Sequence, residues 1–281
     1  MAPNTRSSAE HPGRMRHLKS SGVDLQDIFT QDMTVLHIAE PFQALPAEDP
    51  SSDALRLMHE QGFDVYGVEQ GKRIIGFIPA DAPAGGTCTE ACTAFQLEDI
   101  VSDTTPLLDI IKLLQGKERL YVLSRNRITH IVTRADLQKA PIRMLLFSLV
   151  TLLDMQMLRL IHHYYPDGSW VERLKPKKRI EAAQKVHADR LAKNEGIDLV
   201  DCLQFADKRI ILLKTPEWIT AIQHITSKGK AEQSLERLGT LRDHVAHGQD
   251  LLLGRSWSDL IELTSTAEQL LEEFERIPAS D

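Results

Sequence analysis

The chain has 281 residues, 42% of them hydrophobic and 26% charged, and its formal net charge is −7. This length suffices for two domains of ordinary size, each with its own hydrophobic core. The acidic balance argues against binding of polyanions through a large positive field, so we expect no DNA partner, and any attraction to RNA has to be local. One local candidate is a basic run, although a solvated helix face explains such a run as well. The run consists of Arg173, Lys175, Lys177, Lys178 and Arg179.

Residues 1–22 are rich in Ser, Pro, Gly, Arg and His and lack the apolar core of a signal peptide, which predicts a disordered tail and argues against secretion. The longest apolar stretch, 144–153, is shorter than the roughly 18 residues of a membrane span and is interrupted by Ser148 and Thr151. The three cysteines form no CxxC pair and have no nearby histidine pair, so they predict neither a disulfide framework nor a zinc site. We therefore expect a cytoplasmic protein without membrane contact.

The first half of the chain contains a predicted helix followed by a predicted β-hairpin. The predicted elements are a helix at 50–58 that ends at Gly62 and strands at 65–68 and 73–78 around the turn Gln70-Gly71. The same order returns as a helix at 107–114 that ends at Gly116 and strands at 120–123 and 127–132 around Arg125-Asn126. Equivalent residues such as Gly62 and Gly116 are separated by 54 positions. This spacing indicates two copies of one α/β unit.

The two units resemble CBS repeats, with the similarity extending over about residues 25–139. The resemblance implies a tandem CBS pair with an α+β fold over residues 23–140, in which the two copies form a disc with nucleotide clefts between them. In this family the second hairpin strand runs into a Gly-h-h-Ser/Thr-x-x-Asp signature, where h is apolar. The signature hydroxyl meets a phosphate, and the carboxylate bonds the ribose hydroxyls.

The second repeat keeps the most informative part of this signature. It is written His130-Ile131-Val132-Thr133-Arg134-Ala135-Asp136, with Thr133 and Asp136 in place and the glycine lost. The first repeat, 76–82, keeps the glycine but has Pro79 instead of the hydroxyl and its acid one place early, at Asp81. The resemblance therefore predicts one adenine nucleotide, such as ATP, ADP or AMP, as a regulatory ligand of the second repeat.

We expect Thr133, Arg134 and Asp136 to form this nucleotide site, with Arg134 pairing with a phosphate. The alternative is that Thr133 and Asp136 only cap the helix that begins there, which is an ordinary role for such residues.

Helical periodicity replaces the strand pattern after Pro141. The predicted helices are 144–165, 176–193, 199–213, 218–225, 230–247 and 257–277. Since no strand pattern appears among them, residues 141–281 are predicted to form an all-α bundle.

The segment Leu241-Arg242-Asp243-His244-Val245-Ala246-His247-Gly248 resembles the Arg-x4-6-His motif of the HEPN family, over about residues 144–277. The resemblance implies a homodimeric, metal-independent endoribonuclease that needs no catalytic cofactor. In such an enzyme the ribose 2′-hydroxyl attacks the adjacent phosphate and leaves a 2′,3′-cyclic phosphate end. His247 would move protons, and Arg242 would neutralise the charge that develops on the phosphate oxygens.

Helix geometry adds two expectations. Residues four apart share a helix face, so Asp243 is expected to hold the His247 imidazole in one orientation, while Arg242 lies roughly 140° around the helix from His247. One motif alone therefore makes a poor site, because Arg242 and His247 do not point to the same place. Two copies of the chain meeting across a two-fold axis would bring both arginines and both histidines to one phosphate. Gly248, as a helix stop, would leave His247 near the negative end of the helix.

Other interpretations of the motif stay open. Arg242, Asp243 and His247 can form a local polar cluster on an exposed helix. His244 shares a face with His247, but no third ligand lies nearby, so we expect no metal site. We also expect Asp154 to contact the motif arginine across the bundle.

Together the resemblances predict an endoribonuclease regulated by a nucleotide at the CBS pair, such as a toxin or an effector of phage defence or stress. The segment from Arg134 through Pro141 into Met144 would connect the nucleotide site to the helical bundle. The alternative is a non-catalytic HEPN module that dimerises or binds RNA. A third possibility is a HEPN protein that a separate nucleotidyl transferase modifies.

Overall fold

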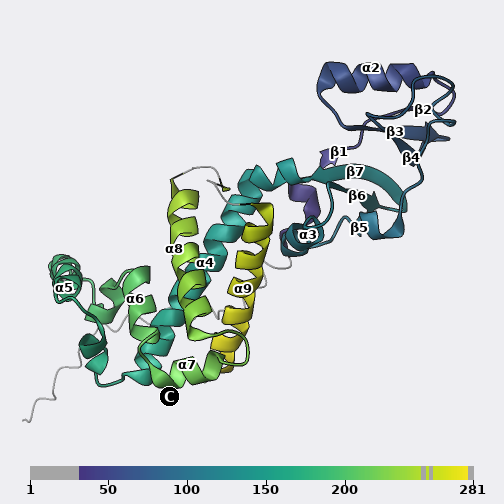
Figure 1. The fold of residues 1–281 in the computed structure, drawn as a ribbon. Helices are drawn as coiled ribbons and strands as arrows, with labels where there is room; N and C mark the ends of the chain where they lie inside the picture. The colour runs from purple at the N-terminus through teal and green to yellow at the C-terminus, as the bar shows by residue number, and fades with distance from the viewer. Residues whose placement is uncertain (1–31, 248–250, 253–255, 278–281) are drawn as a thin grey trace, which may run out of the picture. The chain divides into compact units, whose positions relative to one another are not determined.

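The computed structural model describes residues 32–247, 251–252 and 256–277, so the predicted tail 1–22 and the predicted helix stop Gly248 lie outside the described residues. By their contacts, the described residues of 26–149 and of 241–265 form one compact unit (Figure 1). Those of 150–240 and of 266–281 form a second unit.

Two small sheets build the α/β part of the first unit, in the orders β2-β3-β4 and β1-β7-β6-β5. The first repeat contains β2 (Ala44–Pro46), α2 (Ser51–Gln61), β3 (Val65–Gln70) and β4 (Arg73–Pro79). The second contains β5 (Ile100–Ser102), α3 (Leu107–Leu113), β6 (Arg119–Ser124), β7 (Arg127–Thr133) and the short helix η4 (Arg134–Gln138). The remaining elements are η2 (Val35–His37), β1 (Glu40–Pro41) and η3 (Leu97–Asp99).

Strand pairing confirms the predicted repeat residue by residue. A shift of 54 positions turns the pair Val65 and Pro79 of β3–β4 into the pair Arg119 and Thr133 of β6–β7, and the other pairs of the two hairpins follow the same rule. Both hairpins also change register at the same point, after Val68 and after Val122. The two copies therefore share even their β-bulge.

The tight turns of the two hairpins explain part of this agreement. Gly71 and Lys72 in the first turn have φ of 57° and 64°, and Arg125 and Asn126 in the second have φ of 48° and 61°. Two successive left-handed residues match the twist of antiparallel strands, and Gly and Asn adopt that conformation most readily.

Aromatic residues from both repeats and their connections pack around Tyr121, which is only 1% exposed. Its ring centroid lies 5.3 Å from those of Phe42 and Phe77 and 4.6 Å from that of Phe95. Because Phe77 lies on β4 and Tyr121 on β6, this cluster joins the two repeats. Burial raises the pKa of the Tyr121 hydroxyl well above its ordinary value.

Sequence patterns missed the short strands β1, β2 and β5, since two or three residues show no alternation. β1 pairs with β7, whereas β2 pairs with β3, so the segment 40–46 crosses from the sheet of the second repeat to that of the first.

The described residues of the second half of the chain form helices joined by loops, with no strand among them. Its elements are α4 (Ala140–Tyr164), η5 (Ser169–Arg173), α5 (Lys178–Leu191), η6 (Leu199–Cys202), α6 (Phe205–Leu212), α7 (Pro216–Ile222), α8 (Lys228–Ala246) and α9 (Trp257–Arg276). The prediction of one helix over 199–213 was wrong, because Leu203 and Gln204 are extended and separate η6 from α6. The Asp207 carboxylate accepts a hydrogen bond from Gln204 N at 3.2 Å, which caps the new helix start.

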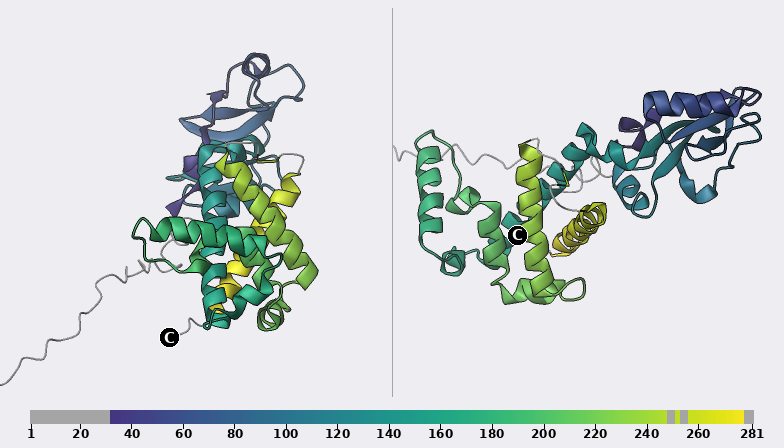
Figure 2. Two further views of the ribbon diagram at one scale, coloured as in Figure 1. Left: turned by 90° about the vertical axis from the view of Figure 1, so that its left-hand side faces the viewer. Right: turned by 45° about the horizontal axis from the view of Figure 1, so that its top comes forward.

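Buried aromatic and polar contacts hold the helical unit together. The rings of Trp218 on α7 and Phe274 on α9 lie 6.1 Å apart. The Arg159 guanidinium on α4 donates to Ile277 O at 2.8 Å and to Phe274 O, so it satisfies carbonyls at the end of α9. Figure 2 shows α5 at the edge of this unit, away from α9.

Helix α4 is 25 residues long, and its length and composition alone would let it cross a membrane. Half of its most apolar window is buried inside the structure, and the core helix of a globular protein passes the same test. Ser148 does not interrupt the helix, because its hydroxyl donates to Met144 O at 2.8 Å within the helix itself.

Gly76 on β4 tests the packing of the first repeat. A Cβ atom at this position would lie 2.5 Å from Thr93 O and even closer to Cys92 Sγ, whereas one at Gly116 would meet open space. We expect Gly76→Ala to lower the free energy of unfolding by about 1–3 kcal/mol. The matched control Gly116→Ala should change it by less than about 0.5 kcal/mol. Urea unfolding of both variants measures this difference, and equal effects would contradict the packing described.

Candidate functional site

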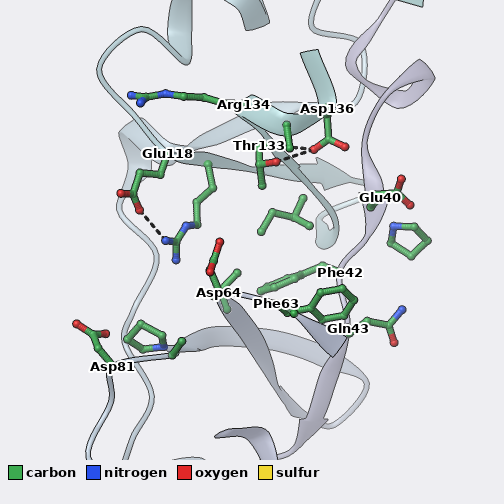
Figure 3. Close-up of a pocket in the computed structure, with 18 residues that line it drawn as sticks. Glu40, Phe42, Gln43, Phe63, Asp64, Asp81, Glu118, Thr133, Arg134 and Asp136 are labelled. Carbon is green, nitrogen blue, oxygen red and sulfur yellow. Dashed lines mark hydrogen bonds and ion pairs between the residues drawn. The ribbon is translucent and has the colours of Figure 1, made fainter. Parts of the chain in front are cut away.

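A cavity of about 930 Å³ lies at the open ends of the two hairpins, where β3 and β6 begin and β4 and β7 end (Figure 3). Its size is in the range of small-molecule sites in proteins, roughly 300–1,000 Å³. Both repeats and the crossing segment contribute to its walls. The lining residues fall in 40–43, 62–65, 79–81, 118–119 and 133–136, with Ile131.

One wall of the cavity is apolar. Figure 3 shows the rings of Phe42 and Phe63 on the wall opposite Thr133 and Asp136. Phe42 is 7% exposed, whereas Phe63 is 42% exposed and presents its ring to the cavity side. A flat aromatic surface of this kind suits a planar heterocyclic base.

Thr133 and Asp136 both line the cavity, and they also bond each other. Asp136 Oδ2 accepts hydrogen bonds from Thr133 N at 2.7 Å and from Thr133 Oγ1 at 3.0 Å. Its other oxygen, Oδ1, lies 2.8 Å from Lys139 Nζ. The predicted capping role is therefore present in the structure. A carboxylate has roughly four acceptor positions, so about one remains for a ribose hydroxyl.

Arg134 is occupied elsewhere. Its Nε donates to Leu114 O at 3.1 Å and its Nη2 to Gln115 O at 3.3 Å, so the guanidinium binds carbonyls at the end of α3. Figure 3 shows the side chain of Arg134 extending away from Asp136. Pairing of Arg134 with a phosphate would require both hydrogen bonds to break, and it stays a prediction.

Arg119 is a cavity residue that the sequence did not reveal. It lies directly opposite Thr133 in the β6–β7 pair, and its Nη2 is 2.8 Å from Glu118 Oε2. The Glu118 side chain is 79% exposed, so this ion pair is close to solvent and weak. A phosphate near Thr133 could replace Glu118 as the partner of Arg119.

The motif residues on α8 are arranged differently from the prediction. Arg242 Nη2 and Nε lie 2.9 Å and 3.2 Å from Asp243 Oδ1, so Asp243 binds the motif arginine. The expected side-chain bond from Asp243 to His247 is not formed in this part of the described chain; instead, His247 N donates to Asp243 O at 3.1 Å. A guanidinium is always charged and binds a carboxylate more strongly than a neutral imidazole does. His247 is exposed and follows the last residue of α8.

Asp154 has a different partner from the one predicted. Its Oδ2 lies 2.8 Å from Lys208 Nζ on α6, and the Lys208 side chain is 5% exposed. This largely buried ion pair lies within the helical unit, and the expected contact of Asp154 with Arg242 stays a prediction.

The basic run is mostly exposed, which fits a solvated face and a local attraction to RNA equally. Arg173, Lys175, Lys177 and Lys178 are exposed, whereas Arg179 Nη1 is 2.7 Å from Asp207 Oδ1. Among the described residues, no three His, Cys, Asp or Glu side chains form a group that could hold a metal ion.

Residues 99–143 match the family model of the CBS domain. The second repeat is therefore similar to a CBS domain. The match includes β6, β7 and η4, and therefore Arg119, Thr133 and Asp136 of the cavity wall. The shared register of the hairpins extends the same α/β unit to the first repeat.

Solved structures of CBS domains are similar to part of the chain. CBSX2 from Arabidopsis thaliana is 20% identical, with a TM-score of 0.34 over 40% of this chain and 96% of that one. The CBS domains of a transcriptional regulator from Streptococcus pneumoniae are 19% identical, with a TM-score of 0.33 over 37% and 95%. The CBS domain of the bacterial CNNM/CorC family Mg²⁺ transporter, in complex with ATP, is 17% identical, with a TM-score of 0.32 over 41% and 90%. No curated protein sequence matches the chain.

The Asp154–Lys208 pair generates a stability prediction. Asp154→Ala leaves the buried Lys208 ammonium without its partner and should lower the free energy of unfolding by about 3 kcal/mol. Glu60→Ala removes an exposed ion pair with Arg56 and should change the free energy of unfolding much less. Lys208→Met in the Asp154→Ala background should recover stability. Chemical denaturation of the set measures this, and no recovery would contradict a buried unpaired ammonium as the cause.

Proposed function

We propose that the paired repeats bind an adenine nucleotide in the cavity and that this ligand regulates an endoribonuclease activity of the chain. One observation carries the binding proposal: Thr133 and Asp136 of the CBS domain face an aromatic wall across a cavity of nucleotide size.

The residues of the cavity suit the parts of such a ligand. The base would stack on Phe63, and a ribose hydroxyl would donate to the remaining acceptor position of Asp136. Thr133 Oγ1 now donates to Asp136, so it has to rotate to donate to a phosphate oxygen. Arg119, opposite Thr133, would exchange Glu118 for that phosphate.

The ribonuclease proposal rests on the motif resemblance and on the exposure of the motif. Arg242 is about one third exposed and His247 is exposed, so both are open to a large substrate. In this proposal Asp243 orients Arg242 rather than His247. His247 would transfer protons at the ribose 2′-hydroxyl and at the leaving oxygen, and Arg242 would stabilise the phosphate oxygens. Two copies are needed, because one helix cannot direct Arg242 and His247 at the same point.

The exposed Arg242–Asp243 pair equally favours a second candidate, a non-catalytic module that dimerises or binds RNA. An arginine bound by its neighbour on a helix surface needs no substrate to explain it.

Binding of AMP tests the first proposal. Phe63→Ala removes the stacking surface and should weaken AMP binding about tenfold, which equals about 1.4 kcal/mol. Phe147→Ala is the matched control, since Phe147 is 41% exposed and lies on α4 outside the cavity lining. Calorimetric titration measures both variants. Absence of AMP binding to the unchanged protein, or equal loss in both variants, would reject the proposed site.

Cleavage of unstructured RNA in EDTA tests the proposed ribonuclease activity. His247→Ala and Arg242→Ala should each lower the rate at least about 100-fold, because each removes a group that acts at the reacting phosphate. His59→Ala, on the exposed face of α2, should leave the rate unchanged. The products should end in 2′,3′-cyclic phosphate. If the unchanged protein does not cut RNA, or if the motif variants cut at its rate, the binding module is the better description.

A further inference from the structure

Acidic side chains outnumber basic ones along the cavity. Five carboxylates line it, those of Glu40, Asp64, Asp81, Glu118 and Asp136, together with the two guanidiniums of Arg119 and Arg134. A site with more carboxylates than guanidiniums repels an anionic ligand unless a basic side chain pairs with each negative charge of that ligand. The arrangement of the basic groups therefore decides how many phosphates the cavity accepts.

Most basic groups near the cavity are already bound. Arg134 donates to Leu114 O and Gln115 O at the end of α3. Lys139, which follows η4, bonds both Asp136 and Glu40 and donates to Ile38 O at 2.5 Å. Within the described lining, Arg119 is thus the basic residue whose partner, Glu118, is solvent-exposed and easily replaced.

The space beyond Arg119 is acidic on both repeats. Asp64 precedes β3, and Asp81 follows β4 on the neighbouring strand, where Ala80 N donates to Asp64 O at 3.0 Å. Neither carboxylate has an ion pair among the described residues. Glu118 is the counterpart of Asp64 in the second repeat, 54 positions later. In Figure 3, Asp64 and Glu118 lie on the same side of the cavity.

We infer that the cavity selects an adenosine ligand with a single phosphate over its di- and triphosphate forms. This inference rests on the proposed nucleotide site and specifies its ligand. Arg119 can neutralise the charge of one phosphate. Each further phosphate would place negative charge near the carboxylates of Asp64, Asp81 and Glu118, and their repulsion would weaken binding. A divalent cation bound to the phosphates removes that penalty, so the selection is strongest without metal.

Calorimetric titration with AMP and with ATP in EDTA at low ionic strength tests the selection. AMP should bind at least about fivefold more tightly than ATP, and 0.5 M salt should reduce the difference, because exposed charges are screened. Mg²⁺ should strengthen the binding of ATP and leave that of AMP unchanged.

Variants of Asp64 and Asp81 test whether these residues cause the selection of AMP over ATP. The double variant Asp64→Asn, Asp81→Asn should strengthen ATP binding in EDTA at least about threefold relative to AMP. Both residues are exposed, so the fold should tolerate the change. Asp109→Asn, on the exposed face of α3 and outside the cavity lining, is the matched control and should change neither affinity.

The outcomes separate this inference from the proposed function. ATP binding in EDTA as tight as AMP binding, or a double variant with unchanged selectivity, overturns the inference while nucleotide binding stands. If neither nucleotide binds to the unchanged protein or to the double variant, the proposed site itself fails.

Discussion

The packing of Tyr121 against Phe42, Phe77 and Phe95 is the contact on which the α/β part depends. The first repeat buries a small core of its own around Met58, Tyr66 and Ile78, whereas the aromatic cluster around Tyr121 draws on both repeats. Because Phe77 lies on β4 of the first hairpin and Tyr121 on β6 of the second, their contact packs the two hairpins against each other. The cavity is a consequence of that arrangement, since its walls are the residues at the open ends of both hairpins.

Sequence patterns predicted the repeat because its hairpins, turns and helix stops recur at a fixed spacing. They did not predict the role of Arg119. Counting outward from the turn Arg125-Asn126 in a regular hairpin places Arg119 opposite Val132, and only the bulge after Val122 moves it opposite Thr133. Local patterns also failed at Leu203 and Gln204, where η6 ends and the Asp207 side chain caps the start of α6.

The polar partners were harder to predict than the elements. Asp136 was expected to bind a ribose or to cap η4, and the structure shows that it caps η4 while facing the cavity. Asp243 binds Arg242 and Asp154 binds Lys208, because in each case a positively charged side chain lies within reach of the carboxylate. The position of the motif on the chain was visible in the sequence, whereas its hydrogen bonds were not.

The central claim is that both repeats together form one nucleotide site. Hydrogen–deuterium exchange of the full chain with and without AMP tests it most directly. A shared site should slow exchange in segments 62–65 and 79–81 of the first repeat and in 118–119 and 133–136 of the second, with no change in α5. Slower exchange confined to one repeat, or found only outside these segments, would contradict a shared site.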